Sequence, residues 1–466
     1  MCEKSKADML KDELFYSPEH TSYACSEQEI KTADEFCGDY MEFLNKCKTE
    51  REAAAFIKEL AEKEGYVPFD PSAKYKEGDK VYSDIHSKAL ILCTFGRQGL
   101  ENGAKIVASH IDSPRLDLKP NPLYEDSELA LFKTHYYGGI KKYQWTAIPL
   151  SLHGVVFRRD GSSVTVRLGD GEGEPRFVVT DLLPHLDKKQ ASKPLEDAIL
   201  GENLNILVGS RPFGQDKGSE MVKLNIMKLI NEKYGITEAD FLSAELEAVP
   251  AFPAVDIGFD RSMIGAYGHD DRVCAYPSVM AAFAAKAPEF TAVTVVTDKE
   301  EIGSDGNTGL NSAYLKHFIA DIAATQGLKG RDVLRASECL SADVNAGFDP
   351  TYPSVHDKMN AAFLNRGIVV TKYTGARGKS GTNDANAEYA AKIQRLFDAE
   401  KVAWQTGELG KVDEGGGGTV AKYIANLGVQ VIDVGVPVLS MHAPFEVVAK
   451  LDVYAAFKGF KAFLES

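Results

Sequence analysis

Two adjacent carboxylates, Glu300 and Glu301, give the strongest chemical signal of the chain. They lie in the segment DKEEIGSDG, after the apolar run TAVTVVT and before a glycine-rich turn, so they fall where a strand should end. Adjacent carboxylates can divide their roles, because one can be held by a metal ion while the other stays free as a general base. A solvated charge pair in a loop is the alternative interpretation.

Two further motifs place acidic and imidazole side chains near expected element ends. In HIDSP, His110 and Asp112 are two residues apart on an expected strand, so both side chains point to one face and Asp112 can orient a metal-bound imidazole. In GHDDRV, Asp270 precedes an expected helix, and its two carboxylate oxygens can bridge two cations. A structural histidine and a helix-capping aspartate are the respective alternatives.

Asp343 in SADVNAG and His442 in VLSMHAP complete the set, although each alone could be an ordinary polar residue at a strand end. The candidate ligands are two imidazoles and three carboxylates: His110, Asp270, Glu301, Asp343 and His442. Mixed nitrogen and oxygen donors suit zinc, cobalt or manganese. With Asp270 as the bridge, each of two divalent ions would receive one histidine, one further carboxylate and a shared oxygen, which leaves room for water.

The elements expected around these residues form an α/β fold. The run KIVASHID, residues 105–112, predicts a buried strand, and residues 34–64 space their apolar positions as one or two amphipathic helices do. Beyond residue 250, apolar strand-like runs alternate with helical stretches, which predicts a mostly parallel sheet flanked by helices. Such sheets bind ligands at the carboxyl ends of their strands, where the candidate residues fall.

Residues from about 120 to 250 have a different pattern. The segment SLHGVVFRRDGSSVTVRLGD reads as two strands joined around an Asp-Gly turn, followed by connections rich in proline and glycine. We therefore predict a discontinuous catalytic domain, residues 1–113 and 256–466, that is interrupted by a β-rich domain, residues 114–255.

Composition excludes several classes of protein. The 466 residues are 44% hydrophobic and 26% charged, as in globular proteins of more than one domain. A net charge of -15 argues against a nucleic-acid partner, because phosphate binding requires clustered Lys and Arg. No apolar run approaches the roughly 20 residues of a membrane span, and the N-terminal residues mix both charge signs, unlike a secretory signal. Seven scattered cysteines, Cys2 among them, predict reduced thiols and a cytoplasmic location.

The motifs HIDSP, GHDDRV, DKEEIG, SAD and SMHAP, in this order, resemble the aspartyl aminopeptidase and vacuolar aminopeptidase I family. The resemblance implies a metalloaminopeptidase acting on peptides, with two metal ions held by the five candidate ligands, Glu300 as the general base and Asp112 as the partner of His110. It further implies that the β-rich insertion is a dimerisation domain and that the chain forms a large homo-oligomer, a dodecamer in the family. LLPHL resembles a segment that reaches a neighbouring active site, which makes His185 a candidate for substrate binding.

The segment KVDEGGGGTV aligns with a family loop near the specificity pocket, and here Glu414 directly follows Asp413. Two carboxylates would repel an acidic side chain, so we expect basic or neutral first residues, unless Lys372, Arg377 or Lys379 neutralises Glu414.

Two other functions stay open. One is a deacylase or carboxypeptidase with a similar metal core, and the other is a noncatalytic homologue that keeps only the shell-forming assembly.

Overall fold

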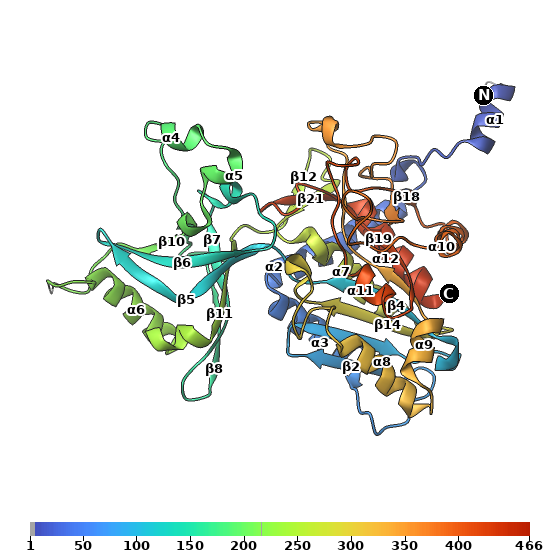
Figure 1. The fold of residues 1–466 in the computed structure, drawn as a ribbon, viewed down its shortest axis with the longest axis horizontal. Coiled ribbons are helices and arrows are strands. Elements are labelled where there is room, and N and C mark those ends of the chain that lie inside the picture. The colour runs from blue at the N-terminus through green and yellow to red at the C-terminus, as the bar shows by residue number, and fades with distance from the viewer. Residues whose placement is uncertain (1–4, 216) are drawn as a thin grey trace.

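The computed structural model describes residues 5–215 and 217–466. These residues form two parts, seen side by side in Figure 1, with a sheet in each. The helices are α1 (Lys6–Leu14), α2 (Glu27–Lys46), α3 (Glu50–Lys63), α4 (Lys188–Ala191), α5 (Leu195–Ala198), α6 (Met221–Tyr234), α7 (His269–Ala284), α8 (Tyr314–Thr325), α9 (Gly330–Ala336), α10 (Ala387–Ala399), α11 (Ala421–Ala425) and α12 (Lys450–Glu465).

The larger part is built on a nine-stranded sheet. In spatial order its strands are β1 (Val67–Pro68), β2 (Lys80–Ile85), β3 (Ala89–Thr94), β14 (Thr291–Thr297), β4 (Ala104–His110), β15 (Glu338–Ser341), β19 (Gln430–Gly435), β17 (Ile368–Thr371) and β18 (Trp404–Thr406). The four central strands, β14, β4, β15 and β19, run parallel to one another. Antiparallel pairings join this centre to β3 and to β17. The predicted mostly parallel sheet is therefore confirmed at its centre, and its margins are mixed.

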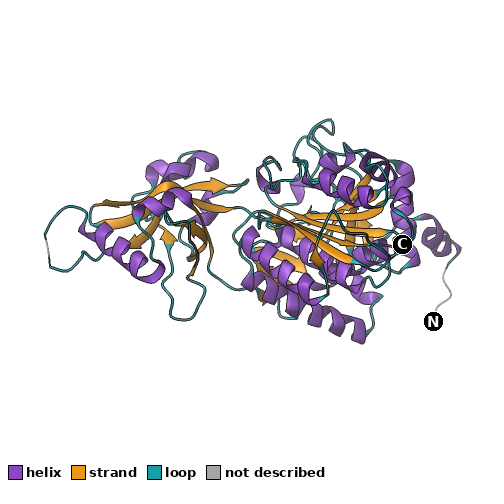
Figure 2. Cartoon of the chain, turned by 90° about the horizontal axis from the view of Figure 1, so that it is seen from below, coloured by secondary structure: helices purple, strands orange, loops and turns teal. Residues whose placement is uncertain are grey.

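Helices cover both faces of this sheet (Figure 2). On β4, Val107 packs into the core shared with α2, α3, α7 and α12, whereas Ile106 and Ala108 pack into the core shared with α8, α9 and α11. Side chains alternate across a strand, so a strand buried on both faces must be apolar throughout. This explains why KIVASHID shows no alternation with polar residues, and it confirms the predicted α/β class.

Two helices, α2 and α3, occupy the region 34–64 for which one or two were predicted, and each begins at a capping box. Ser26 and Glu29 cap α2, and Thr49 and Glu52 cap α3, with side chain and backbone N–H paired in both directions. Such boxes satisfy N–H groups that have no partner inside the helix. The second box marks where the chain turns between the two helices.

The smaller part is an antiparallel sheet with α6 packed on one face (Figure 1). Its strands, in spatial order, are β8 (Ser163–Leu168), β7 (Leu150–Phe157), β11 (Ala244–Pro250), β5 (Arg115–Asp126), β6 (Leu129–Tyr137), β10 (Ile206–Gly209) and β9 (Val178–Val179). β7 and β8 pair as a hairpin around Asp160 and Gly161, as the Asp-Gly signal predicts. The extent of this sheet, from Arg115 to Pro250, supports the predicted insertion, whose limits at 114 and 255 remain our proposal.

A third sheet lies at the edge of the larger part and carries one of the site residues after its strand β20. Its strands are β12 (Val255–Ile257), β13 (Met263–Ala266), β21 (Glu446–Ala449), β20 (Pro437–Leu439) and β16 (Asn345–Ala346).

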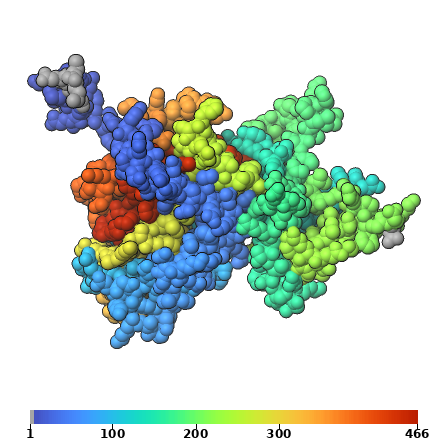
Figure 3. Space-filling view, turned by 180° about the vertical axis from the view of Figure 1, so that it is seen from behind, coloured from blue at the N-terminus to red at the C-terminus, as the bar shows by residue number. Residues whose placement is uncertain are grey.

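Within residues 5–215 and 217–466, none of the helices has the length and apolar composition that a bilayer span requires. The helix α1 buries none of its residues and projects from the body (Figure 3). Cys2 lies outside the described residues, and Cys25, Cys37, Cys47, Cys93, Cys274 and Cys339 are free thiols.

Candidate metal centre

The candidate ligands converge at the carboxyl ends of the central strands. His110 ends β4, Glu301 follows β14, and Asp343 follows β15. Because these three strands are adjacent and parallel, their ends meet at one edge of the sheet. Asp270, at the start of α7, and His442, after β20, approach the same edge from other elements.

Asp270 lies at the centre of the group, with one carboxylate oxygen toward each histidine. Its Oδ1 is 3.2 Å from His110 Nε2, and its Oδ2 is 3.2 Å from His442 Nε2. Asp343 Oδ1 is 3.7 Å from the first imidazole nitrogen, and Glu301 Oε2 is 3.4 Å from the second. The five side chains therefore form two clusters of potential ligand atoms that share Asp270.

The polar atoms in these clusters lack the partners that buried groups normally have. His110 Nε2 and Glu301 Oε1 are buried without a hydrogen-bond partner, which is costly unless a ligand supplies one. The donor set of two imidazoles and three carboxylates is one that zinc accepts. The residues present thus fit two divalent ions, one in each cluster.

The pKa shifts of the clustered side chains also favour bound cations. Burial and the charge of Asp270 raise the pKa of Glu301, and burial raises the pKa of Asp343. Burial alone would lower the pKa of His442, but Asp270 and Glu301 raise it to about 11. Carboxylates crowded in a dry site disfavour their own charge and attract cations. Bound divalent ions would relieve this repulsion.

Glu300 belongs to neither cluster but lines the same cavity. Burial and the nearby charge of Asp343 raise its pKa to about 8, and the positive charge of bound metal ions would lower it again. The backbone N–H groups of Glu300 and Glu301 donate to the Oδ1 and Oδ2 atoms of Asp112, each at 3.2 Å. Asp112 also lies beside His110, whose Nδ1 is 3.3 Å from Asp112 Oδ1 and 3.0 Å from its backbone oxygen.

The cavity above the clusters has a volume of about 460 Å³. One wall is the segment Gly416–Thr419, which explains the run GGGG. A Cβ at Gly415 would collide with the backbone of Leu409, and one at Gly416 with Ala376, so only glycine permits this close packing. Lys422 and Tyr423 complete this wall.

Sequence reasoning missed several residues that surround the clusters. Glu446 on β21 accepts the backbone N–H of Asp270 at 3.1 Å and that of His442 at 2.7 Å. Tyr137 and Gly139, at the end of β6, contact Asp112 and His442. Glu446 lies only four residues after His442, whereas Gly139 and His442 are 303 residues apart. The signal in the sequence for Tyr137 and Gly139 is the YYGG turn after a strand-like run.

His185, Asp413 and Glu414 are exposed and do not line the metal cavity. His185 lies between β9 and α4 of the smaller part, beside the exposed side chains of Leu183 and Leu186. Asp413 and Glu414 precede the glycine wall, next to a second small cavity lined by Lys411, Val412 and Gly415. The structure thus brings the five ligand candidates, Glu300 and Asp112 together, and leaves these three residues at the surface.

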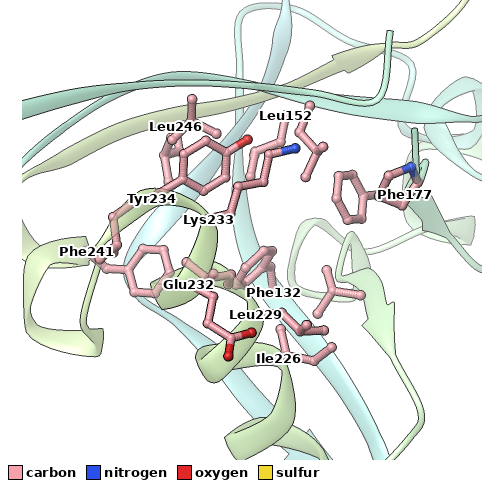
Figure 4. A pocket seen from close by; sticks show the side chains of 16 residues that line it. Phe132, Leu152, Phe177, Ile226, Leu229, Glu232, Lys233, Tyr234, Phe241 and Leu246 are labelled. Atoms are coloured by element: carbon pink, nitrogen blue, oxygen red, sulfur yellow. The ribbon is translucent and has the colours of Figure 1, made fainter. Parts of the chain in front are cut away.

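The smaller part contains a separate cavity of about 530 Å³ between α6 and the sheet (Figure 4). Apolar side chains such as Phe132, Leu152 and Phe241 line it, with Glu232 as its one carboxylate and without an imidazole. Two-metal chemistry needs several nitrogen or oxygen ligands, so this cavity offers no second metal centre.

Comparison with known proteins assigns the chain a family. Residues 43–464 match the model of the peptidase M18 family, described as aminopeptidase I zinc metalloprotease. A probable M18 family aminopeptidase 1 of Clostridium acetobutylicum is 50% identical over 435 residues, which is 92% of this chain and 94% of that protein.

Solved structures agree with the fold. The crystal structure of an M18 family aminopeptidase from Thermotoga maritima is 43% identical, with a TM-score of 0.93, and the match covers 97% of this chain and 100% of that one. The S. cerevisiae mApe1 dodecamer has a TM-score of 0.75 at 19% identity, over 94% of this chain and 97% of that one. At this identity the second likeness concerns the fold alone.

Proposed function

Since this chain belongs to the M18 family of aminopeptidase I zinc metalloproteases, we propose that it removes N-terminal residues from peptides with a two-metal centre. The membership confirms the resemblance predicted from the motifs. The ligands would be His110 and Asp343 for one ion, Glu301 and His442 for the other, and Asp270 for both. The observation that carries this proposal is Asp270, whose two oxygens each face a different imidazole.

Zinc is the metal we propose, with cobalt or manganese as functional substitutes in the same set of ligands. Two such ions supply Lewis acidity, which polarises the scissile carbonyl and lowers the pKa of water toward about 7. Glu300 lies on the wall of the same cavity and belongs to neither cluster, so its carboxylate is free to take the proton of the attacking water and pass it to the leaving amine. Asp112 would fix the imidazole of His110 in a productive orientation.

A panel of metal ions and substrates tests the function. The metal-free protein should hydrolyse no aminoacyl anilide, and added Zn²⁺, Co²⁺ or Mn²⁺ should restore turnover. Hydrolysis of N-acylated amino acids or of C-terminal residues instead would indicate a deacylase or a carboxypeptidase. Absence of turnover with every metal, in protein that binds the metal, would indicate the noncatalytic alternative.

We also propose a preference for basic or neutral first residues over acidic ones, on the ground of Asp413 and Glu414. Lys422 would favour an acidic first residue instead, because its positively charged ammonium group lines the metal cavity whereas Glu414 is exposed. The comparison of kcat/KM for Lys-, Leu- and Asp-anilides should therefore include Glu414→Gln and Lys422→Met. A wild-type preference for Asp that disappears in Lys422→Met would contradict the proposal.

We further propose that the chain acts as a large homo-oligomer in the cytoplasm. The assembly is supported by the exposed leucines near His185, and the S. cerevisiae mApe1 structure is an example of a dodecamer with this fold. In such an assembly His185 would contact the substrate of a neighbouring subunit. The cytoplasmic location is supported by the free thiols of Cys37, Cys47 and Cys93, and cell fractionation with an antibody to the chain would test it.

A further inference from the structure

We infer that the end of strand β6, residues 137–139 of the β-rich insertion, orients both metal-binding histidines. Tyr137 does so through Asp112, and Gly139 does so directly at His442. The inference rests on the proposed metal centre and assigns to the insertion a role in metal binding in addition to assembly. Tyr137 is a positioning residue, because it contacts the partner of a ligand and does not line the metal cavity.

The contact of Tyr137 is a single strong hydrogen bond. Its hydroxyl donates to Asp112 Oδ2 at 2.8 Å, in surroundings where Asp112 is fully buried. The other donors to this carboxylate are backbone N–H groups of Glu300 and Glu301, both at 3.2 Å. The tyrosine therefore supplies the shortest contact that fixes the rotation of the Asp112 side chain. A carboxylate held in this way lies 3.3 Å from Nδ1 of His110 and, together with the backbone oxygen of Asp112 at 3.0 Å, directs Nε2 to the metal side.

Gly139 acts on the other histidine without an intermediate residue. Its carbonyl oxygen accepts from His442 Nδ1 at 2.9 Å. A carbonyl can only accept, so Nδ1 carries the proton and the lone pair of Nε2 is free to face Asp270 and Glu301. The same three-residue segment thus sets the tautomer and direction of His442 and, through the carboxylate of Asp112, supports the orientation of His110.

The segment is itself held rigidly. Arg115, which pairs with Tyr137 across β5 and β6, places its guanidinium 3.8 Å from the centre of the tyrosine ring. Glu247 holds this guanidinium from β11 at 3.1 Å, and Glu50 holds it from α3 at 3.4 Å. The guanidinium that lies over the ring is therefore paired with a carboxylate from each of the two parts of the molecule. Beyond it, a Cβ at Gly139 would lie 3.3 Å from His442 Nδ1, closer than an ordinary van der Waals contact.

Tyr137→Phe tests the first contact, since it removes the hydroxyl and keeps the ring on Arg115. We expect zinc affinity, measured by competition with a chromophoric chelator, to fall about 10-fold, the lower end of the effect of losing a direct partner of a metal ligand. The visible spectrum of the Co²⁺ form should change as well. Excess metal should restore turnover, which loss of a general base would not allow. The matched control is Tyr136→Phe, because the neighbouring Tyr136 is exposed and contacts none of these residues.

Gly139→Ala keeps the carbonyl oxygen but places a methyl group 3.3 Å from His442 Nδ1, so it should displace the imidazole of His442 and weaken zinc binding. The fold of each variant is checked by its melting temperature in EDTA. A melting temperature equal to that of the metal-free wild type shows that the fold is intact. If both variants were folded and kept the zinc affinity and the Co²⁺ spectrum of the wild type, the inference would be overturned. Metal affinity is measured without a substrate, so an inactive wild type would refute the proposed function and leave this test valid.

Discussion

Glu300 and Glu301 are neighbours in the chain, yet their side chains have different surroundings. Glu301 Oε2 lies 3.4 Å from His442 Nε2 and shares a cluster with Asp270, whereas Glu300 belongs to neither cluster. A short turn after β14 therefore delivers one carboxylate to a metal and leaves the other free. The carboxylate of Glu300 is therefore expected to act in catalysis and not in metal binding.

Glu300→Gln should retain both metal ions and lose at least about 100-fold in kcat, because general-base catalysis contributes about 10²–10⁴. Zinc content and turnover of an aminoacyl anilide should be measured on the same sample. Asp305→Asn, an exposed residue of the same loop, is the control and should keep full activity. Near-normal turnover of metal-loaded Glu300→Gln would remove Glu300 from the mechanism.

Asp270→Ala should fail to hold either ion tightly, since it removes the ligand shared by both clusters. Metal analysis after gel filtration should find well under one ion per subunit, compared with two in the wild type. Asp343→Ala is the informative comparison, because it leaves the cluster of Glu301 and His442 intact and should retain one ion. Two ions in the Asp270 variant would refute the bridging role.

At the scale of elements, the junction between the two parts depends on a buried histidine. His153 on β7 lies 2.9 Å from Glu52 of α3 and 3.0 Å from Asp170 of the smaller part. Arg167 and Lys48 flank the same carboxylates. Burial alone would lower the pKa of His153, but these two carboxylates raise it above its ordinary value of 6.5.

The protonated His153 should make stability dependent on pH. Because the pKa is higher in the folded state, its contribution is complete below about pH 6.5 and is lost as pH rises through the folded pKa. We expect His153→Gln to lower the free energy of unfolding by about 3 kcal/mol at pH 6, because the buried carboxylates lose their charged partner. The loss should be smaller at higher pH. Urea unfolding at pH 6 and 9 measures this. An equal loss at both values would show that His153 is neutral in the fold.

At the scale of the whole molecule, exposed leucines on the smaller part mark a surface for assembly. Leu182, Leu183, Leu186 and Leu195 are each about half exposed or more. Apolar side chains gathered in this way usually indicate a contact surface, and three of them, Leu182, Leu183 and Leu186, lie within three residues of His185 in the chain. The proposed oligomer would cover them.

We predict that the wild type is a large homo-oligomer and that Leu183→Asp with Leu186→Asp gives smaller particles in light scattering. A charge introduced into a covered apolar contact is left without a partner and costs several kcal/mol. Val67→Asp, at the edge of the large sheet, is a control that should leave the particle size unchanged. If His185 serves a neighbouring site, the small particles should also lose activity. A fully active wild-type monomer would end the proposal.

The sequence by itself determined the α/β class, the antiparallel hairpin and the position of each candidate ligand at the end of an element. These follow from local rules, because apolar runs form strands, Asp-Gly forms turns, and polar residues at strand ends face the ligand side of a sheet. His110, Glu301 and Asp343 could be found in this way, each from its own strand.

Only the tertiary structure decided how these residues meet. The approach of Asp270 and His442, the glycine wall around Gly416 and the contacts of Tyr137 and Gly139 join segments that lie far apart in the chain. A local pattern records the periodicity of one element, whereas these contacts depend on how separate elements pack. The sequence therefore indicated which residues could bind metal, and packing across the two parts determined which atoms orient them.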